Sequence, residues 1–145
     1  ETPAIYKNNE WGIHPDIYYA EDTLFSNRLF TELFYRSYFD QPANYYYAHH
    51  RDEFKAYKNV DDFINKYQVT STLFNMYSDF LIQQENNLDE SEKLKYNQSD
   101  INAIKSKIEN ALKANIARGI WGDDAFFKIL NMEDQEITIA KKHLN

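Results

Sequence analysis

The stretch SDINAIKSKIENALKANIARGIWGDDAFF, residues 99–127, decides the fold of this chain. Isoleucine and leucine recur in it at spacings of three and four, a pattern that places these side chains on one side of a helix. Ser99 can cap the start of that helix, and Gly119 can take the left-handed conformation that ends one. The sequence therefore predicts one long helix between Ser99 and Gly119. Its apolar positions are Ile101, Ile104, Ile108, Leu112 and Ile116.

An aromatic turn, IWGDDAFF, follows the predicted helix. It sets three large rings around a glycine turn at Gly122, and we expect the Trp121 ring to be buried where the chain turns back. Arg118 lies in the last helical turn, where a cation suits the helix C-terminus. It could form a surface ion pair with one of the aspartates at 123–124.

Polar positions on the long helix complete its description. Asn115 borders the apolar stripe, so it is either a buried amide that fixes helix register or, as we prefer, a half-exposed residue at the stripe's edge. Lys105, Lys107 and Lys113, interleaved with Glu109, are typical of a solvated face.

The composition indicates a single acidic helical domain. The 145 residues include only three glycines and three prolines, with 43% hydrophobic residues, which argues against disorder and against a turn-rich β fold. A formal net charge of −7 disfavours nucleic-acid binding, because such a surface repels phosphates. The absence of cysteine excludes disulfides and thiolate metal sites. No apolar run approaches the length of a transmembrane span.

Further helices are expected before the long one. The first begins at Ser26 and is interrupted by Pro42, and residues 43–54 form a second helix or a bent continuation of the first. Asn59 caps a short helix, and Thr70 caps the next.

The remaining segments define the domain boundaries. Residues 85–98 are polar and thinly anchored, so we expect a loop there between antiparallel helices. Asn131 can cap a last helix. Residues 1–24 are predicted to be a connector from a preceding domain, and residues 25–145 to be a helical domain. The predicted fold is all-α, an orthogonal or irregular bundle of about five to six helices with an extended N-terminal arm.

The densest group of possible metal ligands is His49, His50, Asp52 and Glu53. On a helix, His49 and Glu53 are four residues apart and could share a face. The spacing is not the H-E-x-x-H of zinc peptidases, and no third ligand is predictable, so we interpret the group as a solvated surface. No metal or cofactor is predicted.

A second titratable pair flanks Pro15 in the sequence GIHPD. His14 and Asp16 could act as an acid–base pair, because histidine titrates near neutral pH. The alternative is structural: Gly12 and Pro15 set a turn, and Asp16 bonds backbone amides.

Two segments resemble the C-terminal processing peptidases, or tail-specific proteases, of the Bacteroides-like lineage. The sequence ALKANIARGIWGDDAFFKILNMEDQEITIAKKHL is similar to the closing segment of that family, which reads roughly L-K-A-x-I-A-R followed by W-G-x-x-A-F/Y. The sequence GIHPDIYYAEDT resembles the G-x-x-P-D-I/V segment that closes its protease domain, although Trp11 replaces the usual glycine before Gly12. The resemblance implies that Gly12, Pro15 and Asp16 are structural residues of a turn.

The resemblance implies no catalytic residue in this sequence. The family uses a serine nucleophile and a neutral lysine base, both in the protease domain that precedes the G-x-x-P-D segment. The close pairs here are Ser91 with Lys93 and Ser106 with Lys107. We expect both pairs to be exposed, where a lysine keeps its proton and cannot serve as a base.

The resemblance predicts a function as the helical C-terminal domain of a tail-specific serine endopeptidase, on the periplasmic side of the bacterial cell envelope. The domain would brace its own protease domain, shape access of protein substrates or mediate self-association as a homo-oligomer, without nucleic acid and without a transmembrane span. The alternative is a stand-alone helical module that binds a protein partner through an aromatic-rich surface around residues 45–47.

Overall fold

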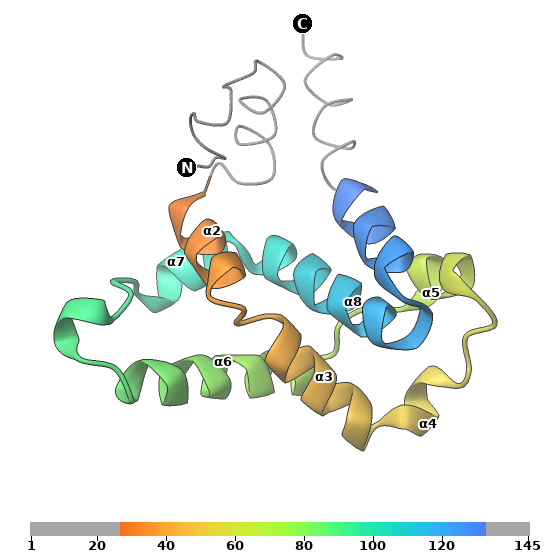
Figure 1. The fold of residues 1–145 in the computed structure, drawn as a ribbon, viewed down its shortest axis with the longest axis horizontal. Coiled ribbons are helices and arrows are strands. Elements are labelled where there is room, and N and C mark those ends of the chain that lie inside the picture. Colours follow the sequence, from red (N-terminus) through yellow and green to blue (C-terminus); the bar gives the residue numbers. More distant parts are fainter. Residues whose placement is uncertain (1–26, 133–145) are drawn as a thin grey trace, which may run out of the picture.

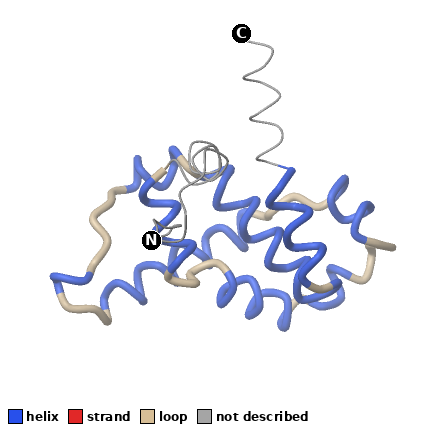
Figure 2. Tube along the Cα trace, turned by 45° about the horizontal axis from the view of Figure 1, so that its top comes forward, coloured by secondary structure: helices blue, strands red, loops and turns tan. Residues whose placement is uncertain are grey.

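The computed structural model describes residues 27–132, and every structural statement below concerns that part of the chain. Its regular structure is entirely helical, with no strand between residues 27 and 132, which confirms the predicted all-α class (Figures 1 and 2). Residues 123–132 are also helical. The helices are α2 (Arg28–Tyr35), α3 (Asp40–His49), α4 (Arg51–Phe54), α5 (Val60–Lys66), α6 (Ser71–Asn86), the 3₁₀ turn η1 (Glu90–Glu92), α7 (Gln98–Ala103) and α8 (Lys105–Trp121).

The helices form an irregular bundle around α8. Helix α6 runs along one side of the body, and α7 and α8 run back on the other side (Figure 1). Helix α3 packs against both α8 and α6, and α5 packs against α8. Residues 87–97, at one end of the body, join α6 to α7, so the predicted antiparallel arrangement of these helices is confirmed.

The apolar stripe of the long helix is the centre of the core, as predicted. The isoleucines and the leucine named above are all buried, and Ile108, Leu112 and Ile116 have no exposed surface. The small side chains of α8 let neighbouring helices come close to it; Ala111, Ala114 and Ala117 are all fully buried. Burying an aliphatic side chain of this size contributes about 1.5–3 kcal/mol, so this stripe supplies much of the driving force for folding.

The prediction of one continuous helix from Ser99 is wrong, because the helix breaks at Ile104 (φ −114°, ψ 20°). Its first part, α7, begins one residue before Ser99. Asn97 is the cap: its side chain accepts from the Asp100 amide at 2.9 Å, and the Asp100 carboxylate accepts from the Asn97 amide at 2.9 Å. Such a reciprocal capping box satisfies two free N–H groups at once, which a lone serine cannot do.

The end of the long helix was also predicted two residues too early. Helix α8 continues through Gly119 to Trp121, and Gly122 takes the positive φ of 98° with ψ −174°. That backbone region is open to glycine almost alone. A Cβ on Gly119 would meet Tyr47 Cδ2 at 3.6 Å, an ordinary contact, so Gly119 is an ordinary helical residue.

The first helix starts at Asn27 rather than Ser26, and it stops before Pro42. Asn27 accepts from the Phe30 amide at 2.9 Å. The helix ends at Tyr35 and is capped by Arg36, and the next residue, Ser37, has φ 62°. The Ser37 amide bonds the Phe34 carbonyl and the Tyr38 amide bonds the Leu33 carbonyl, both at 3.1 Å, which is the Schellman pattern.

Pro42 begins α3 instead of interrupting a helix. It lies in the first turn, where the amide that proline lacks has no intrahelical partner. Residues 43–54 therefore belong to a second helical segment, interrupted at His50, and are not a continuation of the first helix.

The predicted caps at Asn59 and Thr70 are confirmed. Asn59 accepts from the Asp62 amide at 2.8 Å, and Thr70 accepts from the Leu73 amide at 3.1 Å. Asn131 does not begin a separate helix, since residues 123–132 are helical without a break. The arm at residues 1–24 and the helix predicted after Asn131 lie outside the described residues.

Candidate functional site

A cavity of about 1030 Å³ lies at one end of the body, between α2, the α6–α7 connector and α7. Helix α2 and its flanking residues contribute one wall through residues 27–29, Glu32, Arg36 and Tyr38, and the connector contributes another through Leu88 and residues 91–96. Asp100 and Ala103 of α7 complete the lining. The cavity is therefore formed between two rigid helices and a segment with little regular structure.

The buried carboxylate of Glu85, in the last turn of α6, holds this end of the molecule together. It is 7% exposed, and Glu85 and Asn115 are the buried polar residues within 27–132. Glu85 Oε1 accepts from the Leu94 backbone amide at 2.6 Å, and Glu85 Oε2 accepts from the Tyr38 hydroxyl at 3.3 Å. One side chain thus joins α6, the connector and the residues that follow α2.

Arg36 carries the matching positive charge. Its Nη1 lies 3.8 Å from Glu85 Oε2, and its Nε lies 3.7 Å from Glu32 Oε1. Its Nη2 donates to the Glu92 carbonyl at 3.1 Å, which ties α2 to the connector a second time. Each of the three guanidinium nitrogens therefore lies within 4 Å of an acceptor of this chain, and one of them, Nη2, forms a hydrogen bond.

The tyrosines at this end share the polar cluster. Burial raises the pKa of Tyr96, with further contributions from the charge of Glu85 and from Tyr38. The Tyr38 side chain, 7% exposed, also packs edge-on against Phe80 of α6 at 5.7 Å between ring centroids. Arg36 and Tyr38 of the cavity lining thus both contact the buried Glu85 carboxylate, which itself lies outside the lining.

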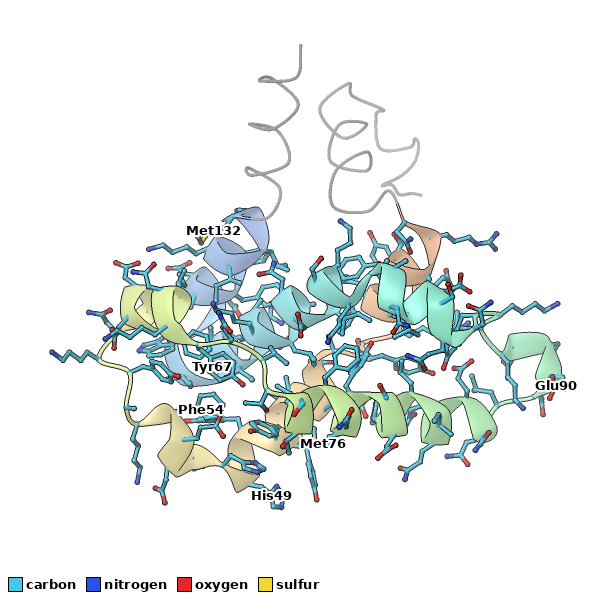
Figure 3. The ribbon with its side chains drawn as sticks, turned by 180° about the vertical axis from the view of Figure 1, so that it is seen from behind. His49, Phe54, Tyr67, Met76, Glu90 and Met132 are labelled. Atoms are coloured by element: carbon cyan, nitrogen blue, oxygen red, sulfur yellow. The ribbon has the colours of Figure 1, made fainter. Side chains whose placement is uncertain are left out.

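The serine–lysine pairs do not form a catalytic dyad. Lys93 is half-buried and not exposed as expected, and its Nζ forms an ion pair with Glu90 Oε1 at 2.9 Å. Ser106 is exposed, and Lys107 Nζ lies 5.8 Å from the centroid of the Phe30 ring. The connector with Glu90 at its outer end is visible in Figure 3.

The predicted motif residues of the aromatic turn come together at the end of α8. The Gly122 amide donates to the Arg118 carbonyl at 2.9 Å, and Arg118 Nε lies 3.0 Å from Asp123 Oδ1. The Arg118 guanidinium also covers the Phe126 ring at 3.6 Å from its centroid. The predicted ion pair is confirmed, with the cation–π contact added to it.

Trp121 is only half-buried, so the expectation of a fully buried plug is wrong. Its ring contacts Phe63 of α5 with 5.4 Å between centroids. The reason is that α8 extends to Trp121, which places this residue on the helix surface facing α5 and not inside the turn. Gly12, Pro15 and Asp16, with His14, lie outside the described residues.

Of the histidine group interpreted as a solvated surface, His49 and Asp52 are exposed, whereas His50 and Glu53 are half-buried. His49 Nδ1 lies 2.9 Å from the Tyr45 carbonyl and His50 Nδ1 lies 2.9 Å from the Tyr46 carbonyl, while Glu53 Oε1 accepts from the Tyr46 hydroxyl at 2.8 Å. Figure 3 shows His49 at the outer edge of the body, pointing away from it. No group of three metal-ligating side chains occurs in the described part of the chain.

Two polar residues of α8 differ from the sequence interpretation. Asn115 is 4% exposed, and its Nδ2 donates to the Ala111 carbonyl at 2.8 Å, so it is the buried amide and not the edge residue. Lys113 is half-buried: its Nζ donates to the Ile64 carbonyl at 2.7 Å and the Tyr67 carbonyl at 2.9 Å. Burial lowers the pKa of Lys113. This ammonium closes the C-terminal end of α5, as helix carbonyls favour.

Sequence reasoning missed Glu85, Arg36 and Tyr38 as one cluster. Glu85 is the first residue of a polar stretch whose composition is typical of a solvated surface, so no apolar periodicity indicates that it is buried. The one available signal was position: Glu85 is four residues after the buried Leu81, and therefore on the core side of α6.

A comparison with protein families matches residues 29–122, about two thirds of the chain, to a family described as a family of unknown function, DUF8443. No curated protein and no solved structure matches the chain significantly. Within residues 27–132, no helix combines the length and the apolar character needed to cross a membrane.

Proposed function

The chain belongs to DUF8443, a family of unknown function, and we propose that it is a non-catalytic helical domain that follows the protease domain of a tail-specific serine endopeptidase. The parent enzyme would cleave proteins that it recognises by their C-termini, on the periplasmic side of the bacterial envelope. The role of this domain would be to brace the protease domain, to shape substrate access or to mediate self-association.

One observation carries the proposal: the stretch that resembles the peptidase family is also the centre of the fold. Its first part is α8, whose buried alanines and aliphatic residues contact α3, and its second part is the turn in which Arg118 pairs with Asp123. A motif built of core and turn residues maintains a shape and performs no chemistry. That matches the role expected of a domain appended to an enzyme.

The polar groups of the cavity support a structural role for the same reason. Glu85 and Arg36 contact partners within the chain, and Lys93 is paired with Glu90. A general base needs a neutral or poorly paired group near the reacting atom, and none of these three paired groups fits that description.

The alternative function is a stand-alone module that binds a protein through residues 45–47. The aromatic surface exposed there is smaller than the sequence suggests. Tyr45 is 59% exposed, but Tyr46 is 2% exposed and its hydroxyl is bound to Glu53. Only one of the three rings is therefore fully offered to a partner, and stable interfaces usually need a larger apolar centre.

The coding sequence immediately upstream of residue 1 tests the proposal directly. We expect an in-frame protease domain that contains a serine and a downstream lysine in suitable order. A stop codon followed by a separate start would contradict the proposal and favour the alternative function.

An activity measurement provides the second arm. The purified 145-residue chain should leave casein and peptides with apolar C-termini intact. Hydrolysis that survives purification and disappears in a His49→Ala or His14→Ala variant would show a catalytic site in this chain itself and would overturn the proposal.

A further inference from the structure

We propose that residues 87–97 form a hinged strap, the moving wall of the cavity, and that the Glu85 carboxylate is the latch that holds the strap shut. The inference concerns a conformational device and does not depend on the proposed function. It rests on the contacts at one end of the body, where a long connector with a single 3₁₀ turn faces α2 across a large cavity.

The strap is joined to the body by few polar contacts, together with the packing of Leu94 and Tyr96 against the core. Within residues 89–96, Glu85 Oε1 receives the Leu94 amide at 2.6 Å, and the Glu92 carbonyl receives Arg36 Nη2 at 3.1 Å. Other polar contacts of this segment are internal to it, such as the Lys93–Glu90 pair at 2.9 Å and the Glu92 amide bonded to the Asp89 carbonyl at 2.8 Å. Internal bonds shape the strap without joining it to the helices.

Both attachments depend on the same carboxylate. Glu85 receives the Leu94 amide directly, and it also lies 3.8 Å from Arg36 Nη1, so it helps to hold the guanidinium that binds Glu92. Loss of the Glu85 charge therefore weakens the direct attachment and frees Arg36 to turn toward Glu32, which lies 3.7 Å from its Nε. A single group thus controls both points, which makes opening cooperative along the strap.

The two ends of the strap are well suited to act as hinges. Helix α6 ends at Asn86 with the Leu88 amide bonded to the Glu85 carbonyl at 3.1 Å, and α7 starts with the reciprocal Asn97–Asp100 cap. These caps stay satisfied whether the strap is open or shut, because none of their atoms belongs to the latch. Opening therefore leaves both helices intact and moves only the wall between them.

Opening the strap would change the surface that the protein offers. Leu88, Leu94 and Tyr96 line the cavity from the strap side and are half-buried in the shut form. Moving the wall exposes these side chains together with Tyr38, which is buried beneath them. The cavity is accordingly a space whose size depends on the state of one carboxylate, and not a fixed cleft.

Hydrogen exchange on the whole chain tests the latch, with Glu85→Gln and Glu85→Ala as variants and Asp79→Asn as the control. Asp79 is an exposed carboxylate on the same helix, so its loss removes the same charge without touching the strap. Glu85→Gln replaces a charge-assisted hydrogen bond with a neutral one and should raise the exchange rate in residues 87–97 by about 10-fold. Glu85→Ala removes the bonding group and should raise that rate by about 100-fold.

Exchange in α8 should stay unchanged in Glu85→Gln, because opening is local. Trypsin gives an independent readout, since Lys93 and Lys95 lie in the strap and should be cleaved faster in the same order of variants. The proposal is overturned if Glu85→Gln exchanges like Asp79→Asn in residues 87–97, or if exchange in α8 rises in parallel with the strap. If Glu85→Ala fails to fold, the Glu85→Gln result decides alone.

Discussion

At one end of the bundle the chain is held by stacked rings, and at the other by a single carboxylate. The first, here the aromatic end, is built from Phe54, Phe63 and Tyr67, with centroid separations of 5.3 Å and 4.8 Å around Tyr67. The second, here the carboxylate end, is Glu85 with its partners at 2.6–3.8 Å. Figure 3 shows Phe54 and Tyr67 in the interior between α4 and α5, far from Glu90 on the connector.

The difference lies in how each end fails. Ring contacts at the aromatic end are numerous, so removal of one ring leaves several other ring pairs in place. The carboxylate end depends on few directional bonds to one group, and an unpaired buried charge costs more than the bonds it made. The two ends should therefore respond differently to the same kind of change.

Alkaline pH should have the largest effect and should separate the two ends. Burial raises the pKa of Tyr67 well above its ordinary value of 10.0, and the Tyr67 hydroxyl has no hydrogen-bond partner among the described residues. A raised pKa means that Tyr67 keeps its proton in the folded state at a pH where the unfolded state loses it. The contribution of neutral Tyr67 to folding stability is therefore complete below about pH 10 and is lost as the pH rises further.

The pH effect is measured by tyrosinate absorbance together with the helical circular dichroism signal. Ionisation of Tyr67, identified by difference from a Tyr67→Phe variant, should coincide with loss of helix. Ionisation of the half-buried Tyr96, identified with Tyr96→Phe, should come first, at a pH where the helices persist. The opposite order would contradict the distinction between a dry end and a movable one.

A core truncation should come next in size. Leu112 is fully buried in α8, and Leu112→Ala should lower the free energy of unfolding by about 2–5 kcal/mol through lost burial and a residual cavity. Leu88→Ala, in the half-buried strap, is the matched control and should cost about 1 kcal/mol or less. Urea unfolding measures both, and equal losses would mean that the strap belongs to the core.

Replacement of the half-buried Trp121 should have an intermediate effect. Its ring covers Phe63 at 5.4 Å but keeps one side exposed, so Trp121→Ala should cost about 1–3 kcal/mol, less than a buried tryptophan would. Urea unfolding measures the loss. It is followed by circular dichroism, because tryptophan fluorescence of the variant would report only on Trp11. A decrease in the free energy of unfolding above that range would favour the buried position of Trp121 that the sequence predicted.

Two glycines of one segment should give small effects of opposite sign. Gly122→Ala should destabilise by about 1–2 kcal/mol, because its φ of 98° with extended ψ strains any residue with a Cβ. Gly119→Ala should stabilise by about 0.5–1 kcal/mol, since a helical Cβ there meets Tyr47 at an ordinary 3.6 Å. Thermal melts of the two variants that shift in the same direction would contradict the position of the helix end.

The apolar half of this fold could be predicted from the sequence, because periodic burial leaves a periodic pattern. Ile108, Leu112 and Ile116 lie where the spacing placed them, and the caps at Asn59 and Thr70 are local enough to be recognised. The boundaries failed where two local signals competed, as with Asn97 against a cap at Ser99.

The carboxylate end could not be predicted, since its contacts span the chain. Arg36 and Glu92 are 56 residues apart, and Tyr38 and Glu85 are 47 apart. Ser37 adds a second reason: it ends α2 with φ 62° although it is not a glycine, so no sequence signal marks the turn that brings Arg36 and Tyr38 to Glu85. Polar interactions of this kind depend on the finished arrangement of the helices.

The position of Lys113 has a consequence for chemical labelling. Its ammonium donates hydrogen bonds to two carbonyls at the end of α5 and lies 5.7 Å from the centroid of the Phe63 ring. The half-buried Lys113 amine is hard for a reagent to reach while it is bonded to these carbonyls, so acylating or alkylating reagents should modify exposed lysines such as Lys55 long before Lys113. The rate at which Lys113 is modified would then report how often α5 separates from α8, and so would measure unfolding of the aromatic end.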